Sequence, residues 1–397
     1  MGVTTFVDQG YDADAYVAPL TYLGLRNTRE GTRNLAKTIM LHQRTGVHVN
    51  LSGGPDLDSL LAAGRTLAAA GALLSFEGPN EPNNFPITHK GRQGGGGCAT
   101  CTWAPVAEFQ RDLYAAVKSD ANLKRYPVFS VSEGGAETDN VGLQFLAIPG
   151  GAETLLPAGT KFADYANVHN YVIGNARIYG DNQAWRAADP TLDGPWDGLY
   201  CEYGLTWLRH FPGYPDRELQ VLPRVTTETG WDSVSDPGGE RVQGTVLVNT
   251  YLAQFKRGWR YTFIFELVDG QGSSTHQGLY RADLTPKPAA FYIHNLTKIL
   301  ADSGIPSHFR HLAYAIPNQP ETVHDMLLEK SNGRLDLVVW GESVSAKHDI
   351  SIALESPAKL VNVYDVTAGA DPIKTLRDTR TIPIELSDHA VVLEIRE

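Results

Sequence analysis

The sequence predicts a (β/α)8 TIM barrel over residues 1–304, followed by an antiparallel β-sandwich over residues 305–397. Three observations support this prediction. The chain has 397 residues, which suits a barrel of about 250 to 300 residues plus a second domain. Short apolar runs alternate with helical segments through the first three quarters of the chain. The remainder contains only short β-rich runs separated by turns.

The barrel elements follow from apolar runs and from helix-capping residues. Asp12 is a suitable N-cap for the first helix, and Gly71 ends an alanine- and leucine-rich helix. We expect strands over residues 3–8, 25–30, 48–51, 73–76, 128–132, 165–171, 225–228 and 261–267. We expect helices over residues 12–22, 33–45, 56–70, 105–119, 241–257 and 288–301.

Two long connections should lie at the end of the barrel where the strands finish. Residues 83–104 contain four consecutive glycines and are expected to form a long loop. The stretch 184–214 is rich in tryptophan, tyrosine and phenylalanine. It could stack against sugar rings, or it could be a lid that packs on its own small core.

The C-terminal part is expected to form strands over residues 326–328, 335–340, 349–354, 360–366 and 391–395. A short linker joins it to the last barrel helix, so we expect it to pack against the barrel and to be structural rather than catalytic.

Composition excludes two classes of partner. The net charge of −11 argues against nucleic acid, because phosphate binding requires a basic surface. No run of about 18 apolar residues exists, so no membrane-spanning helix is predicted. No signal peptide is evident, which fits either a cytoplasmic protein or a secreted or periplasmic one whose signal has been removed.

The chain contains three cysteines. Cys98 and Cys101 follow the glycine run, and Cys201 stands alone. A zinc site would require a second Cys or His pair at matched spacing, and none is evident. A small loop disulfide between Cys98 and Cys101 and a pair of free thiols both stay open. We predict neither a metal nor a cofactor.

Two glutamates at strand ends carry the predicted chemistry. Strand 73–76 leads into Asn80-Glu81, and Pro79 and Pro82 restrict the backbone on either side. A second β-branched strand ends at Glu228. Active sites of such barrels lie at the carboxyl ends of the strands. Two carboxyl groups placed there are what a retaining glycosidase needs, because one protonates the leaving oxygen and the other attacks the anomeric carbon.

With these motifs the chain resembles clan A glycoside hydrolases, the "4/7" barrel superfamily, and is most similar to family 39 and its relatives. The resemblance implies a retaining hydrolase that cleaves an O-glycosidic bond in an oligo- or polysaccharide. Glu81, at the end of strand 4, would be the acid/base with a raised pKa, and Glu228, at the end of strand 7, would be the nucleophile. Their carboxyl groups should then lie about 5 to 5.5 Å apart.

The resemblance also implies residues that contact the sugar or the nucleophile. Asn80 would bind the sugar 2-hydroxyl. Arg29, for which Arg26 is a competitor, would point at the nucleophile. His169 and Tyr171 match a His-x-Tyr pattern whose tyrosine hydroxyl contacts the nucleophile.

Four further residues are predicted as substrate contacts because aromatic rings and carboxylates bind sugars: Glu77, Trp103, Trp231 and Glu266. Many clan members have a tryptophan at the end of strand 8, where this chain reads Phe265-Glu266-Leu267. The pocket floor should therefore differ here, with Glu266 as a polar contact.

Two other functions stay open. A non-catalytic carbohydrate-binding barrel would need neither glutamate. A metal-dependent barrel hydrolase would use histidines and carboxylates at strand ends, but no H-x-H or HExxH spacing appears.

Overall fold

The computed structural model describes most of the chain. The described residues are 1–54, 56–82, 84–96, 102–132, 160–172, 182, 184–188, 223–234, 238–270, 276–304 and 310–397. Cys98, Cys101, Cys201 and most of the aromatic stretch 184–214 lie outside these residues, so the predictions made for them stay predictions. None of the described helices combines the length and apolar character needed to cross a membrane.

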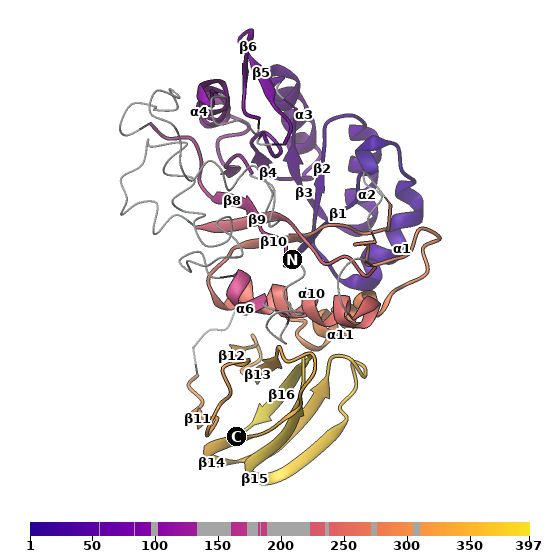
Figure 1. Cartoon of the computed structure of the whole chain (residues 1–397), viewed down its shortest axis with the longest axis vertical. Coiled ribbons are helices and arrows are strands. Elements are labelled where there is room, and N and C mark those ends of the chain that lie inside the picture. The colour runs from indigo at the N-terminus through magenta and orange to yellow at the C-terminus, as the bar shows by residue number, and fades with distance from the viewer. Residues whose placement is uncertain are drawn as a thin grey trace.

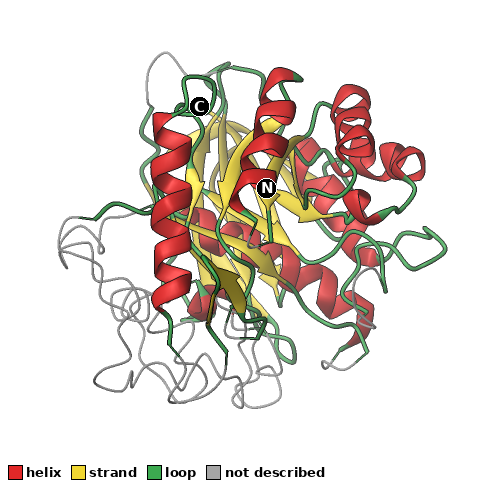
Figure 2. Cartoon of the chain, turned by 90° about the horizontal axis from the view of Figure 1, so that it is seen from above, coloured by secondary structure: helices red, strands yellow, loops and turns green. Residues whose placement is uncertain are grey.

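Eight parallel strands form the barrel in the larger part of the molecule (Figures 1 and 2). The strands are β1 (Gly2–Thr4), β2 (Asn27–Glu30), β3 (His48–Ser52), β4 (Leu73–Glu77), β7 (Val128–Phe129), β8 (Ala166–His169), β9 (Arg224–Thr229) and β10 (Tyr261–Ile264). They are arranged in the order β7-β4-β3-β2-β1-β10-β9-β8. The ends meet where Phe129 and Tyr165 form a parallel bridge. The predicted barrel is confirmed.

Helices surround these strands, as Figure 2 shows. They are α1 (Ala13–Leu23), α2 (Leu35–Thr45), α3 (Leu57–Ala69), α4 (Ala104–Ser119), α6 (Ala184–Ala187), α10 (Gly239–Lys256) and α11 (Pro288–Ile299). Asp12 caps α1 by accepting a hydrogen bond from the backbone of Asp14, and Gly24 ends α1 in the left-handed conformation with φ 67°. The first strand is shorter than predicted, because a 3-10 helix, η1 (Val7–Gln9), replaces its second half.

The segment 83–104 is not a plain loop. It contains a hairpin of β5 (Ile87–His89) and β6 (Arg92–Gly94). Lys90 and Gly91 form its two-residue turn with φ of 50° and 74°, as a type I′ turn requires. The hairpin was not predicted, because Lys-Gly is a weak turn signal and the two strands have only three residues each. The ring of His89 packs edge-on against Phe109 of α4.

The C-terminal part is an antiparallel β domain, as predicted, and it curls around its own apolar core. Its strands are β11 (Tyr314–Ala315), β12 (Val323–Glu329), β13 (Leu335–Gly341), β14 (His348–Asp365), β15 (Lys374–Leu386) and β16 (Ala390–Arg396). All six belong to one hydrogen-bonded sheet. Two predicted strands merge into β14, which continues through an irregularity between Ala353 and Ala358. Strand β15 was not predicted because its first half is polar and exposed.

The β domain packs against helices α10 and α11 of the barrel (Figure 1). Trp340 is fully buried in the same apolar cluster as Val246 and Ile293 of these helices. Asp388, of which 1% is exposed, accepts two hydrogen bonds of 2.9 Å from Arg241. The expected packing of this domain on the barrel is therefore present. The boundary between residues 304 and 305 stays a prediction.

Asp388→Ala is expected to lower the free energy of unfolding by about 2 kcal/mol, because it leaves donors of half-exposed Arg241 and buried Thr245 without their acceptor. Urea denaturation measures this change. The control is Glu385→Ala, since that carboxylate is exposed, pairs with Lys347 and should contribute less than about 0.5 kcal/mol.

Deletion of residues 305–397 should yield insoluble protein. A soluble truncated barrel with an unchanged thermal midpoint would contradict this account of the interface.

Candidate active site

A cavity of about 630 Å³ lies at the carboxyl ends of the barrel strands. Half of the ten residues predicted for the site line it: Arg29, Asn80, Glu81, Tyr171 and Glu228. They come from β2, from the segment after β4, from the segment after β8 and from β9. The carboxyl ends of parallel strands share one edge, so residues far apart in the sequence meet there.

Glu228 is held by two donors. Strand β9 is rich in threonine and is almost entirely buried, and Glu228 lies one residue before its end. Arg29 donates to one carboxylate oxygen at 2.5 Å. Tyr171 donates its hydroxyl to the other at 2.8 Å. Burial and the Glu228 carboxylate raise the pKa of Tyr171 well above its usual value, so it stays a neutral donor. Both contacts hold the Glu228 carboxylate in one orientation.

Arg29 connects Glu228 to a second, deeper carboxylate. It makes a paired contact with Glu77, with both N–O distances at 2.8 Å. It also donates to the side-chain oxygen of Asn80 at 2.6 Å. Burial alone would raise the pKa of Glu77, but Arg29 and His169 outweigh it and hold that pKa far below its usual value. Arg29 is therefore a fixed cation between two acids.

Glu77 is fully buried and does not line the cavity. The structure thus corrects its predicted role as a substrate contact, because its oxygens are occupied by protein donors. Besides Arg29 it accepts from Asn50 at 2.6 Å and from Thr227 at 3.0 Å. Its position orients Arg29 toward Glu228.

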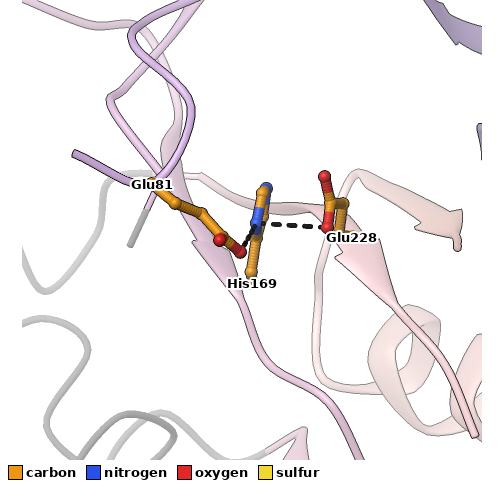
Figure 3. Close-up of side chains that lie close together, drawn as sticks. All are labelled: Glu81, His169 and Glu228. Carbon is orange, nitrogen blue, oxygen red and sulfur yellow. Dashed lines mark hydrogen bonds and ion pairs between the residues drawn. The ribbon is translucent and has the colours of Figure 1, made fainter. Parts of the chain in front are cut away.

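His169 lies between the two predicted catalytic glutamates (Figure 3). Its Nδ1 is 2.7 Å from Glu81 and 3.5 Å from Glu228, and its Nε2 is 3.0 Å from the Thr227 hydroxyl. Burial disfavours a charged imidazole. The carboxylates of Glu228, Glu77 and Glu81 outweigh burial and raise the pKa of His169 to about 9. His169 is therefore an imidazolium at neutral pH. It does not line the cavity, so it acts through its neighbours.

Glu81 follows Asn80 in a left-handed conformation with φ 40°, which is costly for a residue other than glycine. Its pKa was expected to be raised, and this prediction is wrong. Burial does act in that direction, but the hydrogen bond and the charge of His169 dominate and lower the pKa of Glu81. One proton therefore belongs to the Glu81–His169 pair, and in the free protein it resides on the imidazole.

Three predicted substrate contacts lie away from the cavity. Trp103 and Trp231 are buried in two different apolar clusters of the barrel. Glu266 is also fully buried, and its charge acts on Tyr16 of α1. The neighbouring Phe265 lines the cavity instead, and its ring packs edge-on against that of Phe6 with centroids 5.7 Å apart. A tryptophan near a strand end is equally suited to core and cavity, so its sequence position did not distinguish the two.

Several residues of the site were not predicted. Asn50 and Thr227 donate hydrogen bonds to Glu77. Each is a polar residue within an otherwise buried strand, and this pattern could have identified them from the sequence. Phe85 lines the cavity with 60% of its surface exposed. Asp8, in η1, and Glu30, the last residue of β2, also line the cavity.

Three side chains of this site lie close enough together that they could hold a metal ion. Among the residues that the structure describes, Glu81, His169 and Glu228 form a group whose ligand atoms all lie within 4.8 Å of one another. One carboxylate oxygen of Glu81 and one of Glu228 therefore lie no more than 4.8 Å apart. Glu228 already accepts from Arg29 and Tyr171, and Arg29 places a cation beside the group.

Comparison with known proteins gives similarity in structure alone. No protein-family model and no curated protein matches the chain. A family 30 subfamily 8 xylanase from Clostridium acetobutylicum superposes with a TM-score of 0.56 at 11% identity, covering 100% of this chain and 95% of that one. A family 51 arabinofuranosidase from Xanthomonas axonopodis pv. citri gives 0.54 at 14%, covering 96% and 89%. The endo-β1,6-glucanase BT3312 gives 0.55 at 11%, covering 100% and 91%. The chain is thus structurally similar to clan A glycoside hydrolases of several families, at identities that single out no one family.

Proposed function

We propose that this protein is a retaining glycoside hydrolase, with Glu228 as the nucleophile and Glu81 as the acid/base. One observation carries the proposal. Glu81 and Glu228 come from opposite parts of the barrel, and their oxygens approach within 4.8 Å of each other beside a cavity of about 630 Å³. Retaining enzymes place their carboxyl groups about 5 to 5.5 Å apart, whereas inverting enzymes need about 6.5 to 9.5 Å to admit a water molecule.

The first step is attack by a Glu228 oxygen on the anomeric carbon. The glycosidic bond breaks, and its oxygen takes the proton that Glu81 and His169 share, which leaves a glycosyl-enzyme ester. Arg29 and Tyr171 hold Glu228 oriented for this attack. In the second step Glu81 takes a proton from water, the water oxygen bonds to the anomeric carbon, and Glu228 is released as carboxylate.

The position of Asn80 suits a role in substrate binding. Its side-chain oxygen accepts from Arg29 at 2.6 Å, which leaves its amide group as a donor toward the cavity. A donor there can hydrogen-bond a hydroxyl next to the anomeric carbon.

The wild-type protein should hydrolyse at least one member of a panel of aryl glycosides and polysaccharides. Proton NMR of the first product should show the anomer of the substrate, as double displacement requires. A product of opposite configuration would rule out Glu228 as nucleophile. No turnover of any panel member would remove the proposal.

A metal-dependent hydrolase is the second candidate, because Glu81, His169 and Glu228 could hold an ion. Prolonged dialysis against a chelator distinguishes the two. A glycosidase working as proposed keeps its activity. Loss of activity that added zinc, manganese or magnesium restores would favour the metal-dependent mechanism.

His169→Gln should shift the alkaline limit of activity to lower pH. In the wild type the proton is retained until pH approaches the His169 pKa of about 9, so kcat/KM for a substrate with a poor leaving group should fall above that pH. In the variant only the Glu81 carboxyl holds the proton, so the alkaline limit of kcat/KM should fall by about 2 pH units or more. His48→Gln, at an exposed position of β3, is the control. An unchanged alkaline limit in His169→Gln would show that the Glu81–His169 pair does not carry the catalytic proton.

A further inference from the structure

The short helix α6 lies between the β domain and the active site. It runs beside α10 on the side of the barrel that faces the β domain (Figure 1). In the chain it belongs to the connection between β8, which ends at His169, and β9, which carries Glu228. Its four residues are too few for a helix that is stable by itself, so contacts from outside must hold it in place. The proposed mechanism assigns no role to α6 or to the β domain.

Glu342 of the β domain holds the start of α6. It directly follows β13, and only 4% of it is exposed. One of its carboxylate oxygens accepts a hydrogen bond of 2.6 Å from the backbone amide of Trp185. Its backbone carbonyl accepts another, of 2.9 Å, from the backbone amide of Asn182. A carboxylate that accepts from a backbone amide forms one of the stronger hydrogen bonds in proteins, so Glu342 fixes this end of α6.

The side chain of Trp185 contacts both domains. Its ring stacks on that of His324 of β12, with centroids 4.4 Å apart and planes inclined by 23°. The guanidinium of Arg257, directly after α10, lies 3.8 Å from the centre of the Trp185 rings. Arg257 also donates from its Nε to the Trp185 carbonyl at 3.0 Å. The β domain and the barrel therefore hold α6 jointly.

Asn170 joins the other end of α6 to the active site. Its side-chain amide donates to the carbonyl of Ala187, the last residue of α6, at 3.1 Å. Only 1% of Asn170 is exposed, so water does not compete for this contact. Asn170 stands between His169, which contacts both proposed catalytic glutamates, and Tyr171, which donates to the proposed nucleophile. A displacement of α6 would therefore displace the two residues that orient those glutamates.

We infer that Glu342 is a positioning residue for catalysis, and that the β domain orients His169 and Tyr171 through α6. Two hydrogen bonds make the connection, one from the Trp185 amide to Glu342 and one from the Asn170 side chain to α6. Neither Glu342 nor Asn170 lines the cavity, so each acts through its neighbours. This role of Glu342 rests on the proposed function, because it concerns the same active site.

Glu342→Ala should lower kcat on an activated aryl glycoside about 10- to 100-fold, because small misplacements of the groups around a reacting centre are costly. KM should change little, since the groups affected contact the catalytic glutamates. Asn170→Ala should have an effect of similar size. The double variant should be no slower than the slower single variant, because both changes break one connection. Glu342→Gln retains an acceptor oxygen for the Trp185 amide and should keep most of the wild-type kcat.

Asp388→Ala is the matched control. It removes another buried carboxylate of the β domain, one that holds α10 through Arg241 and Thr245. It should lower the midpoint of thermal unfolding and leave kcat unchanged at a temperature where every variant is folded. An equal loss of kcat in Asp388→Ala and Glu342→Ala would overturn the positioning role, because the loss would then belong to the whole interface. Wild-type kcat in Glu342→Ala, or effects that multiply in the double variant, would also overturn it.

NMR spectroscopy tests the connection without requiring hydrolysis. The chain has 12 histidines, and with isotope-labelled imidazole rings the resonance that is absent from His169→Gln identifies His169. Glu342→Ala should shift this resonance although the substitution lies in the other domain, whereas Asp388→Ala should leave it in place. An unmoved His169 resonance in Glu342→Ala would overturn the positioning role. A shifted resonance in a protein that hydrolyses no glycoside would support the connection and contradict the proposed function, so the two failures are distinguishable.

Discussion

Glu228→Ala is expected to reduce kcat on an activated aryl glycoside by about 10⁴-fold or more, because no covalent intermediate can form without the nucleophile. The change also removes the carboxylate that Arg29 and Tyr171 contact, so the vacated space is lined by donors and can admit a small anion. Azide should enter there and attack the anomeric carbon directly. The glycosyl azide would then have the configuration opposite to that of the substrate, which proton NMR identifies.

Glu81→Ala should behave differently under the same conditions. An activated leaving group needs little protonation, so the glycosyl-enzyme still forms, but its hydrolysis stalls without a base. Azide needs no base and should restore turnover with a product of retained configuration. Glu108→Ala, at a glutamate of α4 that pairs with Arg92 away from the cavity, is the control and should keep wild-type kinetics. Exchanged anomers would reverse the two roles, and full activity in either variant would remove that residue from the mechanism.

Arg29→Met is expected to lower the free energy of unfolding by about 3 kcal/mol, because it removes the cation paired with buried Glu77 and leaves only His169, whose Nε2 lies 3.9 Å away. Of Arg29 only 5% is exposed, and of Glu77 none, so water cannot replace the lost partner. Glu77→Leu should also lower the free energy of unfolding, because Arg29 then keeps only its pair with Glu228. The double variant should be more stable than either single variant, since two apolar side chains need no partner. Urea denaturation of the four proteins measures the coupling.

Activity should separate structural from functional effects in this series. All three variants should lose hydrolysis, because each removes or misplaces the cation that orients Glu228. Recovery of stability without recovery of activity in the double variant would show that the ion pair serves the site. Arg44→Met removes an exposed pair with Asp14 and should cost less than about 0.5 kcal/mol. A single Arg29→Met variant as stable as the wild type would contradict the buried pair.

The sequence by itself determined the elements of the barrel and the strand ends that carry chemistry. Strand and helix periodicity, the cap at Asp12 and the apolar run before Glu81 are local features that act over a few residues. Local rules also identified the C-terminal part as an antiparallel β domain. They failed for β15, whose exposed polar first half lacks an apolar face, and for the hairpin at Lys90 and Gly91.

Only the tertiary structure decided what surrounds each carboxylate. The contact of Arg29 with Glu228 joins residues 199 positions apart, and that of Thr227 with Glu77 joins residues 150 apart, so no local pattern contains them. The sign of the Glu81 pKa shift depends on a histidine 88 positions away. Whether Trp231 faces the core or the cavity depends on how strands pack around the barrel. Charge interactions and burial act through space, whereas sequence patterns report only neighbours along the chain.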